Sequence, residues 1–197
     1  MKKEGIKMTR NVKHIAISLM VLSALILVSC SSANYTAYSN EMLTGKNFLQ
    51  DQEYEKAKEY FIQASNVQQN SASLALLGTT YYKMGDLANA ERTIIEAERI
   101  DKSSDYYMRI LGYKALILLK QGKPEGISAL KQYADYVKQL GIPLEMHEIE
   151  KMIRSNSANL AVLEPKIDEQ IAWYEDESER WKKGQPGYFQ EKYGIPL

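Results

Sequence analysis

The chain has 197 residues, with 25 basic and 25 acidic side chains, so its formal net charge is zero. A single cysteine excludes a disulfide within one chain, and two histidines are too few for a His-rich metal site or Cys–His catalysis. Beyond residue 13 the basic residues form no block, so nucleic-acid binding has little electrostatic support. Composition therefore predicts neither a metal nor a nucleic acid as partner.

The first 30 residues have the layout of a secretory signal, in which a basic stretch precedes an apolar run and small residues. The apolar run, Ile15–Val28, has 14 residues, whereas a helix that spans a bilayer needs about 20. Its end, Leu27-Val28-Ser29-Cys30, resembles the lipobox of bacterial lipoproteins. An uncleaved N-terminal anchor is the alternative, and translation can begin at Met1 or at Met8.

The resemblance implies that residues 1–29 are a signal peptide cut just before Cys30. Cys30 would then carry covalent diacylglycerol and an N-acyl chain such as palmitate, and no other cofactor is expected. Ser31 stands where the family places an aspartate for retention at an inner membrane, so the resemblance favours the outer membrane of a bacterial envelope, on its periplasmic face. Residues 1–29 hold five of the 25 basic and one of the 25 acidic residues, which leaves a formal charge of −4 on residues 30–197.

Residues 38–103 repeat at an offset of 33, a period that predicts stacked helical hairpins. Side-chain size recurs at six matched pairs: Gly45 and Gly78, Phe48 and Tyr81, Tyr54 and Leu87, Ala57 and Ala90, Phe61 and Ile94, Ala64 and Ala97. Glycine costs about 1 kcal/mol against alanine inside a helix. We expect Gly45 and Gly78 to offset this cost by close helix approach, opposite Ala57 and Ala90. The large side chains around this gap are expected to fill it: Phe48, Tyr81, Phe61 and Ile94.

The pattern resembles the tetratricopeptide repeat (TPR). Leu77-Gly78-x-x-Tyr81 is similar to the family's first-helix signature, and Gly85-Asp86-Leu87-x-x-Ala90 to its turn and second-helix start. The first copy departs from this pattern at Thr44 and Gln52, and both copies lack the family's terminal proline. The resemblance implies an all-α solenoid of TPR-like helical hairpins. We also expect Asp86 to cap the helix that follows it.

A third unit is degenerate, and whether it is a true TPR stays open. An apolar helix over 110–119 precedes Gln121-Gly122-Lys123-Pro124, and a stripe of apolar residues at helical spacing follows. Aligning Gly122 with Gly85 requires an offset of 37 instead of 33.

The predicted organisation runs from the signal peptide (1–29) through a short tether (30–37) to a repeat domain (38–140). The repeat units cover about 38–70, 71–103 and 104–140. C-terminal helices follow over 141–183, with an irregular tail over 184–197. We expect Pro165 to open an acidic, amphipathic helix that caps the solenoid and keeps its acidic run, 175–179, in solvent. The aromatic C-terminus either packs on the core, which we favour, or forms a docking patch.

The first helices of a helical-repeat array line a groove. Helical geometry places eight candidate partner-binding residues on that face: Met42, Lys46, Gln50, Thr79, Tyr82, Lys83, Arg109 and Lys120. Lysines, tyrosine and glutamine beside apolar side chains suit an extended peptide, and TPR proteins often bind peptides in this way. The alternative for each residue is an ordinary solvated or packing position.

The sequence favours a non-enzymatic scaffold or adaptor, bound to a protein or peptide in the groove and to the membrane through its lipid. Envelope assembly, secretion and pilus complexes all suit such a protein. One rival is an envelope enzyme such as a peptidoglycan hydrolase, which would need Glu145, Glu148 or Glu164 paired in a pocket. Another is a structural subunit that self-associates through its aromatic tail. His147 fits a structural or surface role better than a ligand role.

Overall fold

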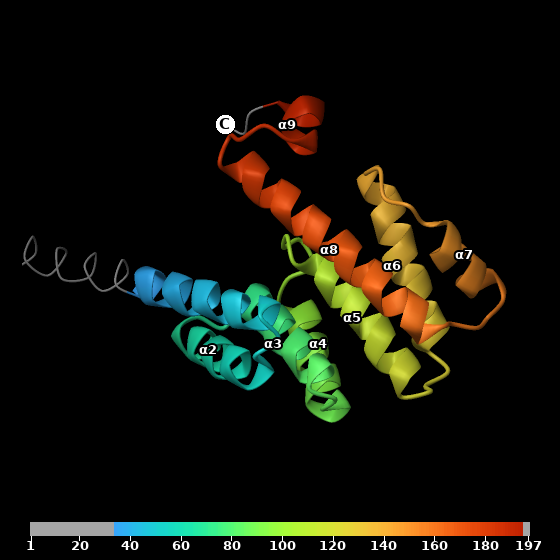
Figure 1. The fold of residues 1–197 in the computed structure, drawn as a ribbon, viewed down its shortest axis with the longest axis horizontal. Helices are drawn as coiled ribbons and strands as arrows, with labels where there is room; N and C mark the ends of the chain where they lie inside the picture. Colours follow the sequence, from blue (N-terminus) through green and yellow to red (C-terminus); the bar gives the residue numbers. More distant parts are fainter. Residues whose placement is uncertain (1–33, 195–197) are drawn as a thin grey trace, which may run out of the picture.

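The computed structural model describes residues 34–194, and every regular element in that range is a helix. The helices are an N-terminal helix over residues 34–50, α2 (Tyr54–Val67), α3 (Ser71–Lys83), α4 (Leu87–Ile100), α5 (Tyr107–Lys120), α6 (Gly126–Leu140), α7 (His147–Arg154), α8 (Leu160–Lys182) and α9 (Tyr188–Tyr193) (Figure 1). The predicted signal peptide, Cys30 and the first part of the tether lie outside the described residues. Between residues 34 and 194, no helix combines the length and apolar character needed to cross a bilayer.

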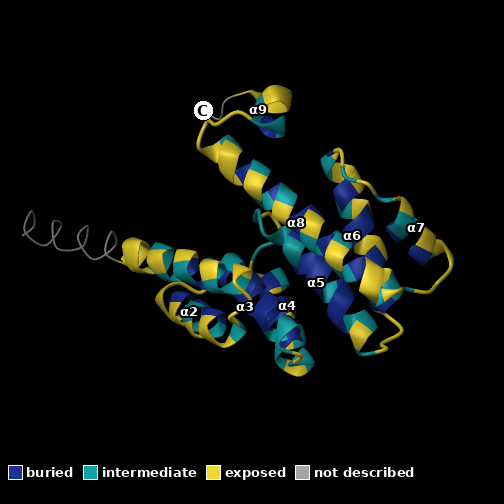
Figure 2. Cartoon of the chain, viewed as in Figure 1, coloured by how far each residue is buried: buried dark blue, intermediate teal, exposed yellow. Residues whose placement is uncertain are grey.

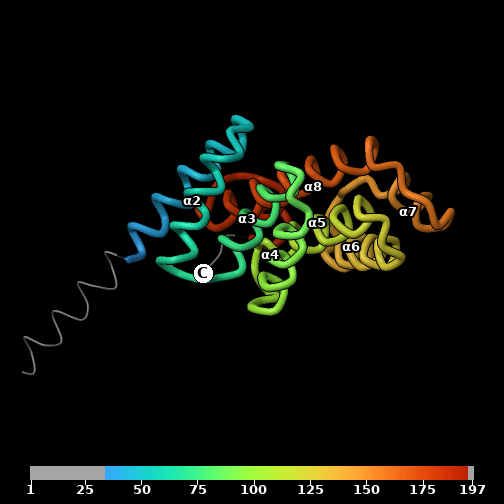
Figure 3. The backbone as a smooth tube through the Cα atoms, turned by 90° about the horizontal axis from the view of Figure 1, so that it is seen from below, coloured from blue at the N-terminus to red at the C-terminus, as the bar shows by residue number. Residues whose placement is uncertain are grey.

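Consecutive helices form hairpins that stack on one another. The N-terminal helix pairs with α2, α3 with α4, and α5 with α6, while α2 also packs on α3 and α4 on α5. The first hairpin and α7 lie at opposite ends of the molecule (Figure 3). The prediction of an all-α array of helical hairpins is therefore confirmed.

The three hairpins turn with the same backbone geometry. At each turn a backbone NH closes a hydrogen bond of 2.9 Å, from Glu53 to the Phe48 carbonyl, from Asp86 to Tyr81 and from Lys123 to Leu118. The residue before each donor is left-handed, with φ of 62° at Gln52, 81° at Gly85 and 68° at Gly122. This geometry is a helix C-terminal Schellman motif, in which glycine is favoured. The first copy keeps the motif although it has Gln52 at the position of the glycine. The third turn aligns with the second at the predicted offset of 37.

The repeat glycines allow close packing inside the hairpins. A Cβ added at Gly45 would lie 2.7 Å from the Phe61 ring, and one at Gly78 would lie 2.7 Å from the Ile94 side chain. Phe61 and Ile94 therefore fill the space at these glycines, as expected. The nearest atoms belong to these two side chains and not to Ala57 and Ala90, opposite which the close approach was expected. Asp86 caps α4 as expected, because its side chain accepts a hydrogen bond of 3.2 Å from the Asn89 NH.

Helix α8 is a component of the core. A small apolar cluster holds the N-terminal helix to α2 and α3, and a larger one extends from α3 to α9. The larger cluster includes Leu163, Ile167 and Ile171 of α8, which are at most 1% exposed. Figure 2 shows the buried residues along α5, against which α8 packs.

Three predicted boundaries differ from the structure. Residues 34–37 already belong to the N-terminal helix, so this part of the predicted tether is helical. Helix α8 begins at Leu160, not at Pro165, because Asn159 caps it by accepting a hydrogen bond of 3.1 Å from the Ala161 NH. Pro165 therefore lies inside α8, where it removes the helical hydrogen bond to the Ala161 carbonyl.

The third difference is α9, a helix inside the tail that was predicted to be irregular. Phe189 is 7% exposed and packs its ring against Trp173 and Tyr174. Burial of this aromatic side chain gives the short segment a reason to fold despite the glycines on both sides. The expectation that the aromatic C-terminus packs on the core is confirmed for Phe189.

Candidate functional site

The inner face is the surface of the N-terminal helix, α3 and α5 that the sequence predicts to line a groove. In the structure α8 covers much of it. Thr79 and Tyr82 are both 1% exposed, and Met42 is buried in the small core. Lys83 and Arg109 bind carboxylates of α8. The expectation of an open groove at Thr79, Tyr82, Lys83 and Arg109 is therefore wrong. Side chains of α8 bind the last three of these residues, and Thr79 is buried beside Arg109.

One end of the α8 contact is a network around Lys83. Its Nζ donates to Glu164 Oε1 at 2.7 Å and to Asp168 Oδ2 at 2.6 Å. The second oxygen of each carboxylate accepts from a tyrosine, Glu164 from Tyr82 at 2.7 Å and Asp168 from Tyr113 at 2.6 Å. Three residues of α3 and α5 thus satisfy two carboxylates one helical turn apart.

The network is charged at neutral pH. Burial lowers the pKa of Lys83, but its hydrogen bonds to Asp168 and Glu164 outweigh burial and raise the pKa above the usual value. Burial raises the pKa of Glu164, but hydrogen bonds from Lys83 and Tyr82 outweigh it and lower the pKa. Burial, then the bond to Glu164, raises the pKa of Tyr82, which stays a neutral donor. These groups hold α8 in place and supply no acid or base near neutrality.

The second anchor is an ion pair between Arg109 of α5 and Glu175 of α8. Nε and Nη2 of Arg109 donate to the two oxygens of Glu175 at 2.7 and 3.0 Å, and Nη1 donates to Thr79 Oγ1 at 3.3 Å. The side chains are only 12% and 18% exposed. The acidic run 175–179 was expected to be solvated, and at Glu175 this is wrong because the carboxylate neutralises a buried guanidinium.

Apolar packing makes α8 a permanent part of the fold. A Cβ added at Gly112 would lie 2.8 Å from Ile167 and 3.1 Å from Ile171, so α5 and α8 are in close contact. Complete burial of an aliphatic side chain contributes about 1.5–3 kcal/mol, so Leu163, Ile167 and Ile171 together contribute about 5–9 kcal/mol. Substitutions at Tyr82 or Lys83 would therefore disturb the fold before any partner.

An open cleft remains between the N-terminal helix and the C-terminal half of α8. Its volume is about 190 Å³, and it is lined by Lys46, Asp105, Tyr106, Glu175, Ser178, Glu179 and Lys182. The acidic groups are already paired: Glu175 with Arg109, Glu179 with Lys183, and Asp105 with Lys182. Lys46 Nζ lies 5.2 Å from the centre of the Tyr106 ring. A hydrogen bond from Lys183 and, more weakly, the charge of Lys46 lower the pKa of Glu179. Within residues 34–194 no carboxylate lies within ion-pair distance of Lys46, so its ammonium group can bind an incoming one.

The other two candidates lie outside this cleft. Gln50 is exposed at the end of the N-terminal helix, and Lys120 is exposed at the end of α5. Lys120 Nζ lies 4.4 Å from the centre of the Tyr82 ring, so it covers the edge of the α8 contact. The structure thus leaves Lys46, Gln50 and Lys120 available and uses the other five candidates internally.

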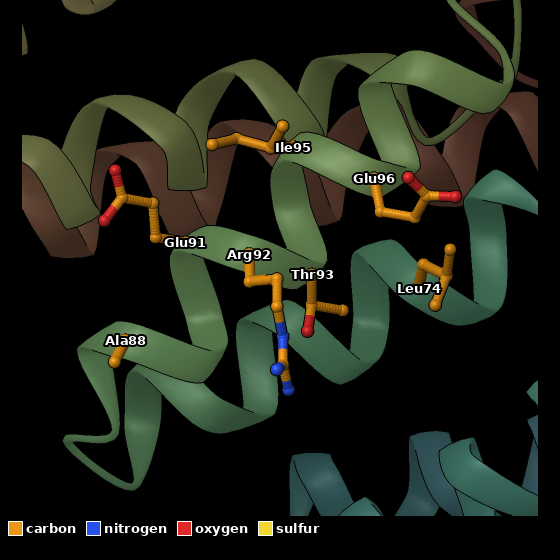
Figure 4. A pocket seen from close by; sticks show the side chains of 7 residues that line it. All are labelled: Leu74, Ala88, Glu91, Arg92, Thr93, Ile95 and Glu96. Atoms are coloured by element: carbon orange, nitrogen blue, oxygen red, sulfur yellow. The ribbon is translucent and has the colours of Figure 1, made fainter.

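A larger hollow of about 670 Å³ lies beside α4 and the start of α3 (Figure 4). Figure 4 shows side chains of Glu91, Arg92 and Glu96 around it, together with Ile95, which is 50% exposed. Hydrogen bonds from Lys123 and Arg99 lower the pKa values of Glu91 and Glu96, respectively. Both are therefore carboxylates, and neither is suited to act as an acid near neutral pH.

Of the residues named for a hydrolase, Glu145 lines a pocket of about 340 Å³ together with Glu169 and Lys166, and Glu164 belongs to the Lys83 network. Glu164 bonds to Lys83 and Tyr82, and a hydrogen bond from Lys166 lowers the pKa of Glu145. A glycosidase acid needs a raised pKa. His147 is exposed at the start of α7. Among residues 34–194, no cluster of three His, Cys, Asp or Glu side chains could hold a metal ion.

Sequence reasoning missed the carboxylates that bind the inner face. Glu164, Asp168 and Glu175 stand at i, i+4 and i+11 of α8, which places them on one side of the helix. Ile167 and Ile171 follow the same side. This acidic and apolar stripe was visible in the sequence and matches the basic and tyrosine residues of the inner face.

Comparison with known proteins adds no relative. No protein-family model matches the chain, and a search of curated proteins finds no match.

Proposed function

We propose that this protein is a lipid-anchored scaffold of the bacterial envelope, of the TPR type, that binds a protein partner in the cleft beside Lys46. The observation that carries the proposal is the cleft itself, an open part of the inner face between the N-terminal helix and α8. Three hairpins with the same turn geometry support the TPR resemblance. The proposal treats the protein as an adaptor without catalytic activity.

The cleft suits a peptide or helix with an acidic side chain. Tyr106 offers an aromatic wall, and Lys46 offers an ammonium group above it. The same face already holds α8 through carboxylates and aliphatic side chains, so its chemistry is suited to an acidic, amphipathic segment. An incoming carboxylate at Lys46 would repeat this mode of recognition.

The membrane part of the proposal rests on the lipobox. Cys30 would carry the diacylglycerol and N-acyl lipid, and Ser31 favours the outer membrane. Fractionation of cells tests it: Cys30→Ser should give a folded protein that leaves the membrane fraction. A Cys30→Ser variant that still fractionates with membranes and functions normally would contradict the anchor.

The cleft is tested by crosslinking in cells, identification of the captured partner, and pull-down with two variants. Lys46→Glu should lose the partner while the protein stays folded, because the half-buried cation–π contact with Tyr106 contributes about 0.5–2 kcal/mol. Lys151→Glu on α7 makes the same charge change at an exposed lysine outside the cleft and should keep the partner. If Lys46→Glu retains the partner as well as Lys151→Glu does, the cleft is not the binding site.

A further inference from the structure

Two stretches of the chain that meet in the structure contain no charged residue. Residues 31–40 and 60–82 contain no Asp, Glu, Lys or Arg, although 25% of the chain is charged. The two stretches meet in space, where Tyr38 Oη donates to Asn70 Oδ1 at 3.2 Å. We call residues 34–40 and 66–70 the uncharged end. Its exposed side chains include Asn34, Tyr35, Asn66, Val67, Gln68 and Gln69.

The uncharged end lies at an extremity of the molecule (Figures 1 and 3). Along its own helices the nearest charges are Glu41 and Glu59. At 1.5 Å per residue they are about 10 Å from Asn34 and about 12 Å from Val67. The screening length at physiological salt is about 8 Å. A surface in contact with this end therefore meets little of the field of those two carboxylates.

The position of Cys30 indicates which surface this is. Only three residues separate Cys30 from Asn34, so the Cα atom of Cys30 would lie within about 14 Å of the first described helix. We infer that the uncharged end is a membrane-contact surface that lies on phospholipid headgroups. This inference rests on the proposed lipid anchor.

The side chains of this end fit a headgroup layer. Asparagine and glutamine amides and the tyrosine hydroxyl donate and accept hydrogen bonds, so they can bind phosphate and ester oxygens. Tyrosine is enriched at membrane–water interfaces, and Tyr35 is 69% exposed. Residues 30–197 carry a formal charge of −4, which anionic lipid repels at short range. Contact through the uncharged end keeps the Glu41 and Glu59 carboxylates about 10 Å or more from Asn34 and Val67, beyond the screening length.

Two aromatic exchanges test the inference. Tyr35→Trp places a tryptophan at the uncharged end, and Tyr193→Trp places one at a similarly exposed tyrosine of α9, which is 57% exposed. The lipidated proteins are reconstituted into vesicles of phosphatidylethanolamine and phosphatidylglycerol containing brominated phosphatidylcholine. Emission from Trp173 and Trp181 is subtracted with the wild-type protein. We expect bromine to reduce the added emission of Tyr35→Trp about twofold and to leave that of Tyr193→Trp nearly unchanged.

A second experiment tests the membrane-contact surface independently of the proposed lipid anchor. The unlipidated chain from residue 30 onward contains all the described helices, and its Cys30 thiol is coupled to a maleimide-bearing phospholipid in the same vesicles. Mass spectrometry of the cellular protein shows whether Cys30 is lipidated. If Cys30 is not lipidated, the proposed anchor is wrong, and the quenching measured with the coupled chain alone tests the membrane-contact surface. Equal quenching of both tryptophans, or stronger quenching at position 193, would overturn it.

Discussion

Glu175→Gln should destabilise the protein much more than any other amide substitution in the acidic run. The change removes the negative charge from a carboxylate that accepts two hydrogen bonds from Arg109, at 2.7 and 3.0 Å. Burial lowers the pKa of Arg109, but Glu175 outweighs burial and raises it, so the guanidinium remains charged. The variant would therefore bury an unpaired cation between α5 and α8.

The size of the effect follows from burial. Breaking a buried pair by removing one partner costs about 3–5 kcal/mol. Because the Glu175 side chain is still 18% exposed, we expect the free energy of unfolding to fall by the lower value of this range, about 3 kcal/mol. For a protein of this length that corresponds to a fall in melting temperature of about 6–12 °C. Urea denaturation and thermal melts followed by circular dichroism measure both quantities.

Two further variants make the test specific. Asp176→Asn removes the next carboxylate, whose ion pair with Arg180 is largely exposed, and should cost less than about 0.5 kcal/mol. Arg109→Met combined with Glu175→Met removes both charges and should lie closer to wild type than Glu175→Gln does. If Glu175→Gln is as mild as Asp176→Asn, Arg109 and Glu175 are not a buried pair in solution.

Two other predictions concern the turns and the acid limit of stability. Gln52→Gly should stabilise the protein by about 1 kcal/mol and Gly85→Ala should destabilise it by a similar amount, because each backbone is left-handed, with φ of 62° and 81°; thermal melts that show the same sign for both would contradict this. Glu164 has a pKa below its unfolded value of 4.5, so its stabilisation is present above pH 4.5 and is lost as pH falls through the lowered pKa. Urea unfolding between pH 6 and pH 3 should therefore show a shallower acid loss for Glu164→Gln than for wild type, and parallel curves would refute this.

The repeat could be predicted from sequence because the signals that indicate it are local. A period of 33, paired glycines and an Asp86 cap all concern neighbours within one hairpin, where helix geometry fixes which side chains meet. Gln52 shows the limit of such signals. Its left-handed backbone is imposed by the turn that both flanking helices require, although glutamine itself gives no indication of it.

The position of α8 could not be predicted in the same way. Glu164, Asp168 and Glu175 mark an acidic face, but an acidic face is equally compatible with solvent. What decides its position is complementarity with Lys83, Tyr113 and Arg109, which are distant in sequence. The candidate groove residues were chosen for helix direction alone, so the prediction could not distinguish a face that binds a partner from a face that binds its own chain.

This distinction changes where partner binding is to be sought. An array of three helical hairpins is near the minimum that is stable. Helix α8 supports it by contributing three fully buried aliphatic side chains and three carboxylates that bind the inner faces of α3 and α5. The inner faces of the second and third hairpins are thus used for stability. The first hairpin keeps Lys46 and its cleft open, and it is also the hairpin that follows Cys30. With the proposed lipid on Cys30, a partner bound there would lie close to the membrane.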